Sequence, residues 1–154
     1  MEGASKLWPM FVGLTVLCWG AYVPTLHTGQ TAFEGKGPLR AFLFVGVAYF
    51  LASAAVLTYL GLSRAEPLSL TSRGVSFSTI AGVLGAIGAL GIVFALRYGG
   101  KPIYVAPLVF AGAPIINTVV SMIWHPPQER PHVLFLVGIV VAAAGASLVL
   151  RFKP

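Results

Sequence analysis

The chain is dominated by five long apolar runs, which are separated by short polar segments. The runs cover residues 7–26, 40–60, 75–97, 102–124 and 132–151. A helix needs roughly 20 apolar residues to cross the hydrocarbon layer of a bilayer, and backbone groups in lipid must pair within their own segment. The pattern therefore predicts an all-α integral membrane protein, a bundle of five transmembrane helices in one membrane domain that covers residues 1–154.

The four acidic residues of the chain, Glu2, Glu34, Glu66 and Glu129, all lie outside the apolar runs. Ion-coupled transporters often hold a carboxylate in the middle of the membrane, and none of these runs supplies one. We therefore expect any cavity between the helices to be lined by neutral polar and aromatic side chains.

Composition supports lipid as the solvent of this protein, because 57% of its residues are hydrophobic, 9% are charged and the mean hydropathy is +0.89. A soluble core of this size cannot hide so much apolar surface. The net charge of +6 would suggest a nucleic-acid partner in a soluble protein. Here the basic residues stand singly or in pairs at the ends of apolar runs, as interfacial anchors do, so we expect a lipid bilayer and no nucleic acid as partner.

The distribution of the basic residues weakly indicates how the chain is oriented in the membrane. Those on the side of the N-terminus are Lys6, Arg64, Arg73 and Arg130, and those on the other side are Lys36, Arg40, Arg97, Lys101, Arg151 and Lys153. Since the larger group is expected in the cytoplasm, the sequence favours an N-out, C-in arrangement. Insertion in both orientations remains open.

Small residues and prolines mark the third and fourth runs. Gly82, Gly85, Gly88 and Gly91 spread around the third helix and predict close packing against more than one neighbour. Pro107 and Pro114 each remove a backbone donor from the fourth helix and favour a kink. The carbonyls freed by a kink face either a cavity or a packed neighbour, and the sequence leaves both open.

Neutral polar and aromatic side chains within the runs are the candidates for solute binding. They are Asn117, Ser121, Thr118, Trp19, Tyr22, Tyr49 and Ser53. Asn117 and Ser121 lie four residues apart and share a helical face. A buried carboxamide needs partners for two donors and an acceptor, which are supplied by a solute or by a neighbouring helix. Trp19 and Tyr22 offer a flat wall suited to a sugar, a nucleoside or an organic cation, although aromatic packing also explains them.

Enzymatic chemistry is not expected. The sequence shows no nucleophile with a paired base, no carboxylate dyad and no phosphate-binding glycine loop, and it suggests no cofactor. His27, His125 and His132 stand at the ends of different runs and are too scattered for a metal site, so we interpret them as interfacial polar groups.

Several short motifs follow one another along the runs. They are Cys18-Trp19-Gly20 in the first run, then Ala95-Leu96-Arg97-Tyr98 with Gly99-Gly100, Val105-Ala106-Pro107-Leu108 with Pro114, Glu129, and the small-residue stretch 138–145. In this pattern nearly the whole chain resembles one EamA-type repeat of the drug/metabolite transporter superfamily. Two features depart from the family pattern, because residues 125–128 separate Glu129 from the fourth run and the connector 27–38 is long.

This resemblance implies a ten-helix transporter made of two five-helix repeats of opposite orientation, of which this chain holds one. The expected function is that of a small-molecule transporter, or half of one, working as a dimer by alternating access on a neutral or organic solute. The inverted partner would be a second copy of the chain or another five-helix protein. We expect the protein in a bacterial inner membrane. The alternative is a non-transporting membrane subunit or scaffold that packs against a partner membrane protein.

Overall fold

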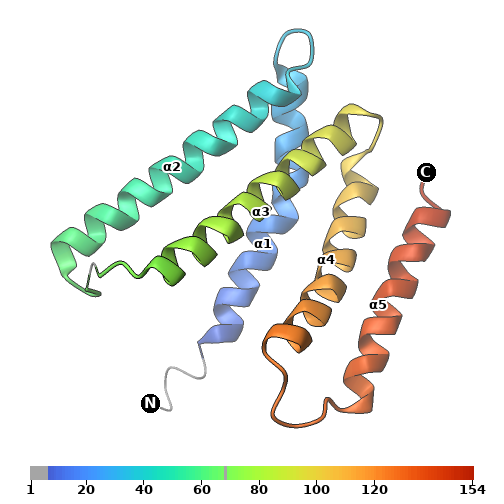
Figure 1. The fold of residues 1–154 in the computed structure, drawn as a ribbon. Helices are drawn as coiled ribbons and strands as arrows, with labels where there is room; N and C mark the ends of the chain where they lie inside the picture. The colour runs from blue at the N-terminus through green and yellow to red at the C-terminus, as the bar shows by residue number, and fades with distance from the viewer. Residues whose placement is uncertain (1–6, 68) are drawn as a thin grey trace. The chain divides into compact units, whose positions relative to one another are not determined.

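The computed structural model describes residues 7–67 and 69–154, and this part of the chain contains helices and no strand. The helices are α1 (Trp8–Ala32), α2 (Pro38–Ser63), α3 (Ser72–Arg97), α4 (Pro102–Trp124) and α5 (Val133–Arg151) (Figure 1). Each is long and apolar enough to cross a membrane. The prediction of an all-α fold with five transmembrane helices is confirmed, and the chain is a multi-pass integral membrane protein.

Helix α1 differs most from its predicted span, because it continues to Ala32 instead of ending at residue 26. Polar residues do not stop a helix, and Thr31 supports this one by donating its Oγ1 hydrogen to the carbonyl oxygens of His27 (3.1 Å) and Thr28 (3.0 Å). Pro24 consequently lies inside α1 rather than at its end. The segment 27–38 that was predicted to leave the membrane as a connector is therefore helical in its first part.

Local chemistry sets several of the other helix ends. Thr71 accepts a hydrogen bond from the Gly74 amide at 3.2 Å and so begins α3. The Nδ1 atom of His132 accepts from the Leu134 amide at 3.2 Å at the start of α5. Pro38 and Pro102 occupy the first turns of α2 and α4, where a missing N–H costs least. Residues with hydrogen-bonding side chains or fixed φ angles thus mark these boundaries.

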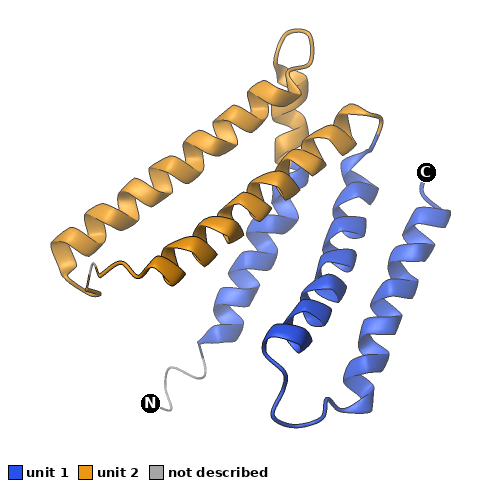
Figure 2. Cartoon of the chain, in the orientation of Figure 1, with its two compact units in different colours: residues 1–24, 100–154 blue, residues 25–99 orange. Residues whose placement is uncertain are grey.

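The structure divides into two compact units, coloured separately in Figure 2, and each is described by itself. Unit 1 contains residues 1–24 and 100–154, and its main feature is the antiparallel hairpin of α4 and α5. The Trp19 ring of α1 lies 6.1 Å from the Phe110 ring of α4, measured between centroids. This aromatic contact connects the first part of α1 to the hairpin.

Unit 2 contains residues 25–99, with the rest of α1 and the hairpin of α2 and α3. Phe33 stacks on Phe44 with ring centroids 5.9 Å apart, and the Arg40 guanidinium lies 5.2 Å from the Phe33 ring. Gly37 sits in this tight turn, where a Cβ atom would come within 2.6 Å of Arg40 Nε and 2.9 Å of Phe33 Cβ. A side chain at position 37 would therefore force Phe33 or Arg40 to move.

Few side chains of either unit are buried within the chain itself. In α5 no residue is buried, and in α3 the buried residues are Ile92, Val93 and Leu96. Apart from the chain neighbours and the nearby backbone of α3 itself, no atom of the described part of unit 2 lies within 4 Å of the Cβ that would be added at Gly82, Gly85, Gly88 or Gly91. The close packing predicted for these glycines is not made inside unit 2 and stays a prediction for a neighbour.

Candidate functional site

A polar face runs along the second half of α4. Asn117, Ser121 and His125 follow one another at intervals of four residues, with Thr118 and Met122 beside them. Residues at this spacing lie on one side of a helix, each about 6 Å further along its axis. Because α4 ends at Trp124, the face continues into the segment that connects α4 to α5.

Pro107 and Pro114 lie within α4, which continues as one helix through both. Each proline lacks the N–H that would bond the carbonyl four residues earlier, so the carbonyls of Ile103 and Phe110 lose their usual donors. Thr118 adds a hydrogen bond here, since its Oγ1 donates to the Pro114 carbonyl at 2.9 Å. Backbone hydrogen bonding is therefore weakened in α4 just before the half that carries the polar face.

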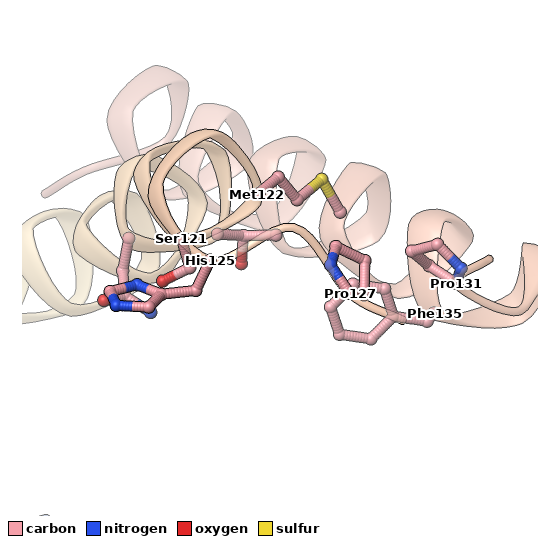
Figure 3. A pocket seen from close by; sticks show the side chains of 8 residues that line it. Ser121, Met122, His125, Pro127, Pro131 and Phe135 are labelled. Carbon is pink, nitrogen blue, oxygen red and sulfur yellow. The ribbon is translucent and has the colours of Figure 1, made fainter. Parts of the chain in front are cut away.

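A hollow of about 530 Å³ opens beside this face, within unit 1. Its lining residues come from α4, from the α4–α5 connection and from α5: Asn117, Thr118, Ser121, Met122, His125, Pro127, Pro131 and Phe135. Figure 3 shows Ser121 and His125 at one end, and Pro127, Pro131 and Phe135 at the other. The hollow thus joins a polar wall to an apolar one.

The polar wall has side-chain donors and acceptors that make no hydrogen bond within the described part of the protein. Among the described residues, the side chains of Asn117 and Ser121 make no hydrogen bond, and Asn117 is exposed. Thr118 has used its hydrogen on Pro114 and retains acceptor lone pairs. The wall offers a carboxamide, hydroxyl groups and an imidazole to whatever occupies the hollow.

No Asp, Glu, Lys or Arg is found among the described residues that line the hollow. His125 is the titratable side chain there, and Phe135, which is 51% exposed, supplies an aromatic surface. Such a lining can bind an uncharged molecule by hydrogen bonds on one side and by apolar contact on the other. It has no carboxylate for proton or cation coupling.

Three of the seven predicted site residues, Asn117, Thr118 and Ser121, lie together in this hollow. Trp19 and Tyr22 belong to α1, and neither is among the lining residues; the Trp19 ring contacts Phe110 instead. Tyr49 and Ser53 belong to α2 in unit 2, and Ser53 Oγ donates to the Tyr49 carbonyl at 2.9 Å. A role for these four residues in solute binding stays a prediction.

Sequence reasoning missed five lining residues, namely Met122, His125, Pro127, Pro131 and Phe135. His125 carried a usable signal, because it continues the spacing of Asn117 and Ser121 by one further step of four residues. No sequence signal marks Phe135, since its place in the hollow depends on the packing of α5 against α4. His125, which its position at the end of a run predicts to be an interfacial polar group, also lines the hollow in the structure.

Another polar pair lies on the extended part of α1 in unit 2. His27 Nδ1 and Gln30 Nε2 are buried and make no hydrogen bond to the described part of the protein. Gln30 is 4% exposed, and its backbone carbonyl oxygen accepts a hydrogen bond from the Gly37 amide at 3.0 Å. The interpretation of His27 as an interfacial polar group does not predict this burial, and no sequence signal marks Gln30, because both residues follow the end of the first apolar run.

Comparison of the chain with protein-family models, with curated proteins and with solved structures gives no match.

Proposed function

We propose that this protein is a small-molecule transporter, or half of one, of the drug/metabolite type. It works as a dimer by alternating access on a neutral or organic solute and resides in a bacterial inner membrane. The solute passes through the hollow beside α4. The family assignment rests on the sequence resemblance described above, and the proposed site rests on the structure of unit 1.

The observation that carries the proposal is the hollow that Asn117, Thr118 and Ser121 share with Phe135. Its volume of about 530 Å³ is within the range of small-molecule pockets. An exposed carboxamide at membrane depth must meet protein, water or solute, because lipid offers it no hydrogen bond. A solute with both hydrogen-bonding groups and an apolar face satisfies both walls.

The depth of the hollow favours an inverted partner. Asn117 lies seven residues before the end of α4, about 10 Å along the axis, and the other lining residues follow it in sequence, so the hollow lies in one half of the membrane. A partner of opposite orientation would carry an equivalent hollow near the other face. Two such openings would be related by an axis in the membrane plane, as the halves of an inverted-repeat transporter are.

Uptake by reconstituted vesicles tests the proposal directly. The purified chain in proteoliposomes is expected to accumulate at least one of three labelled probes above empty vesicles: glucose, uridine or tetraphenylphosphonium. These probes represent the sugar, nucleoside and organic-cation classes that suit a wall of amide, hydroxyl and aromatic groups. Uptake equal to that of empty vesicles across all three classes, and across wider panels of neutral solutes, would contradict a transport function.

Orientation is tested by cysteine labelling in a Cys18→Ser background. The connections that contain Glu34 and Glu129 lie at opposite membrane faces, because three helices separate them. If the partner is an inverted second copy, a membrane-impermeant maleimide should label Glu34→Cys and Glu129→Cys each in about half of the molecules in intact cells. Labelling of one position alone would exclude the inverted homodimer and leave a different five-helix protein as the partner.

One observation favours the second candidate, a non-transporting subunit or scaffold. None of the five described helices contains an Asp or Glu, so the membrane-embedded part lacks the usual coupling group. A subunit of this kind would copurify with one larger membrane protein in stoichiometric amount and would show no uptake by itself. A chain that transports without such a protein would exclude this alternative.

A further inference from the structure

One end of unit 1 concentrates positive charge without acidic neighbours. Lys101 precedes α4, while Arg151 ends α5 and Lys153 follows it, and these segments lie at the same end of the antiparallel hairpin (Figure 1). We call these three residues the basic end. Among the described residues, none of the three forms an ion pair with a carboxylate.

Aromatic rings hold two of the three cations. The Lys153 Nζ atom lies 5.5 Å from the centre of the Tyr104 ring, which places the segment after α5 against the first turn of α4. The Arg151 guanidinium lies 5.7 Å from the centre of the Phe152 ring. A ring positions a cation without neutralising it, so the full charge stays available to a ligand.

The opposite end of the same hairpin provides an internal contrast. The segment between α4 and α5 carries Glu129 next to Arg130, so its formal charges cancel. The two ends of one hairpin therefore differ by three positive charges. Solubility alone would not require this difference in charge between the two ends of the hairpin. A bilayer with anionic headgroups at one face would match it.

Helix lengths place the basic end at the headgroup layer. The 19 residues of α5 extend over about 28 Å, close to the hydrocarbon thickness of a bilayer. Arg151 and Lys153 then lie at the level of lipid phosphates when α5 spans the membrane. Tyr104 is an amphipathic side chain of the type enriched at this depth.

We infer that the basic end binds the phosphate of an anionic phospholipid headgroup, with Lys101, Arg151 and Lys153 as its charged contacts. The ligand is a lipid rather than a free anion, because exposed apolar residues such as Leu148 (60%) and Leu150 (53%) lie beside the cations and match acyl chains. The site is separate from the hollow, since no residue is common to both. It also does not require the protein to transport.

Native mass spectrometry of the purified full chain with added lipids tests this site. The wild type is expected to retain phosphatidylglycerol in preference to phosphatidylcholine. The triple variant K101Q/R151Q/K153Q should lose this preference, with affinity falling about fivefold for each charge removed. The matched control is Arg130→Gln, which removes one positive charge from the opposite end of the hairpin and should keep the preference.

Further variants separate specific binding from general charge and from misfolding. The charge-conserving K101R/R151K/K153R should retain phosphatidylglycerol, and Tyr104→Leu should weaken retention because it removes the ring beneath Lys153. Helix content by circular dichroism verifies that each variant is folded. Equal retention of both lipids by the wild type, or an equal loss in Arg130→Gln and in the single variant Lys153→Gln, would overturn the inference. Displacement of the lipid by millimolar inorganic phosphate would also overturn it, in favour of a free-anion site.

Discussion

Solute flux should fall about tenfold to a hundredfold when Asn117 is replaced by leucine, while the protein remains folded and dimeric. The carboxamide is exposed in the hollow and makes no hydrogen bond within the described chain, so its donors and acceptor are available to the solute. Leucine has a similar volume but offers no polar atom. A solute that sheds water in the hollow would then lose its partner, and initial uptake rates in proteoliposomes measure the effect.

Two variants serve as controls for this experiment. Asn117→Gln keeps a carboxamide on a longer stem and should retain a measurable part of the flux. Ser147→Ala removes a hydroxyl group from α5 that donates to the Ala143 carbonyl at 3.0 Å and lies outside the hollow, so its flux should match that of the wild type. Cross-linking and circular dichroism report dimer formation and folding. Unchanged flux in Asn117→Leu would remove this residue from the transport path.

The apolar pattern predicted the number and type of helices because hydrocarbon leaves the backbone few alternatives. A run of 20 to 23 mostly apolar residues cannot leave its peptide groups unpaired in lipid, so helix type follows from length alone. The apolar pattern does not predict the end of α1. Beyond residue 26 the chain becomes polar, and polarity decides where a helix leaves the lipid but does not decide where it ends.

The candidate site could be predicted only as far as it lies on one helix. Asn117, Thr118 and Ser121 share a face of α4 because their spacing follows the helical period, which the sequence displays directly. Phe135 and Pro131 reach the same hollow through the turn and packing of the α4–α5 hairpin, which no periodicity records. The depth of the hollow near the end of α4 also depends on that hairpin.

The charge asymmetry of the hairpin connects the two proposals. An anionic leaflet that binds Lys101, Arg151 and Lys153 would hold this end of unit 1 at the cytoplasmic face, in agreement with the C-in orientation that the basic residues favour. The hollow at the other end would then open toward the outside. In an inverted copy the same cations would face the opposite leaflet. A strong preference for anionic lipid would therefore favour one orientation, and equal labelling of both orientations would not be expected.

Membrane integration should fall sharply when Val141 is replaced by arginine. Val141 lies next to the midpoint of α5 and is 63% exposed, so the new charge would face hydrocarbon at the depth where it costs most. Insertion of an arginine at the centre of a helix costs roughly 2.5–3.5 kcal/mol, which corresponds to a shift of about a hundredfold in the insertion equilibrium of this span. Labelling of Pro154→Cys by a membrane-impermeant maleimide, in the Cys18→Ser background, measures the fraction of molecules in which α5 is integrated, because the C-terminal residue changes sides when α5 does not cross.

The matched control for this experiment is Val133→Arg, at the first residue of the same helix. Val133 is 70% exposed, so the two positions differ mainly in depth. An arginine at the helix end can extend its guanidinium to the headgroups and should leave the integrated fraction close to that of the wild type. Equal behaviour of the two variants would mean that α5 does not cross the hydrocarbon with its centre at mid-depth. Both proposed sites depend on that placement, since it sets the basic end at one headgroup layer and the opening of the hollow toward the other.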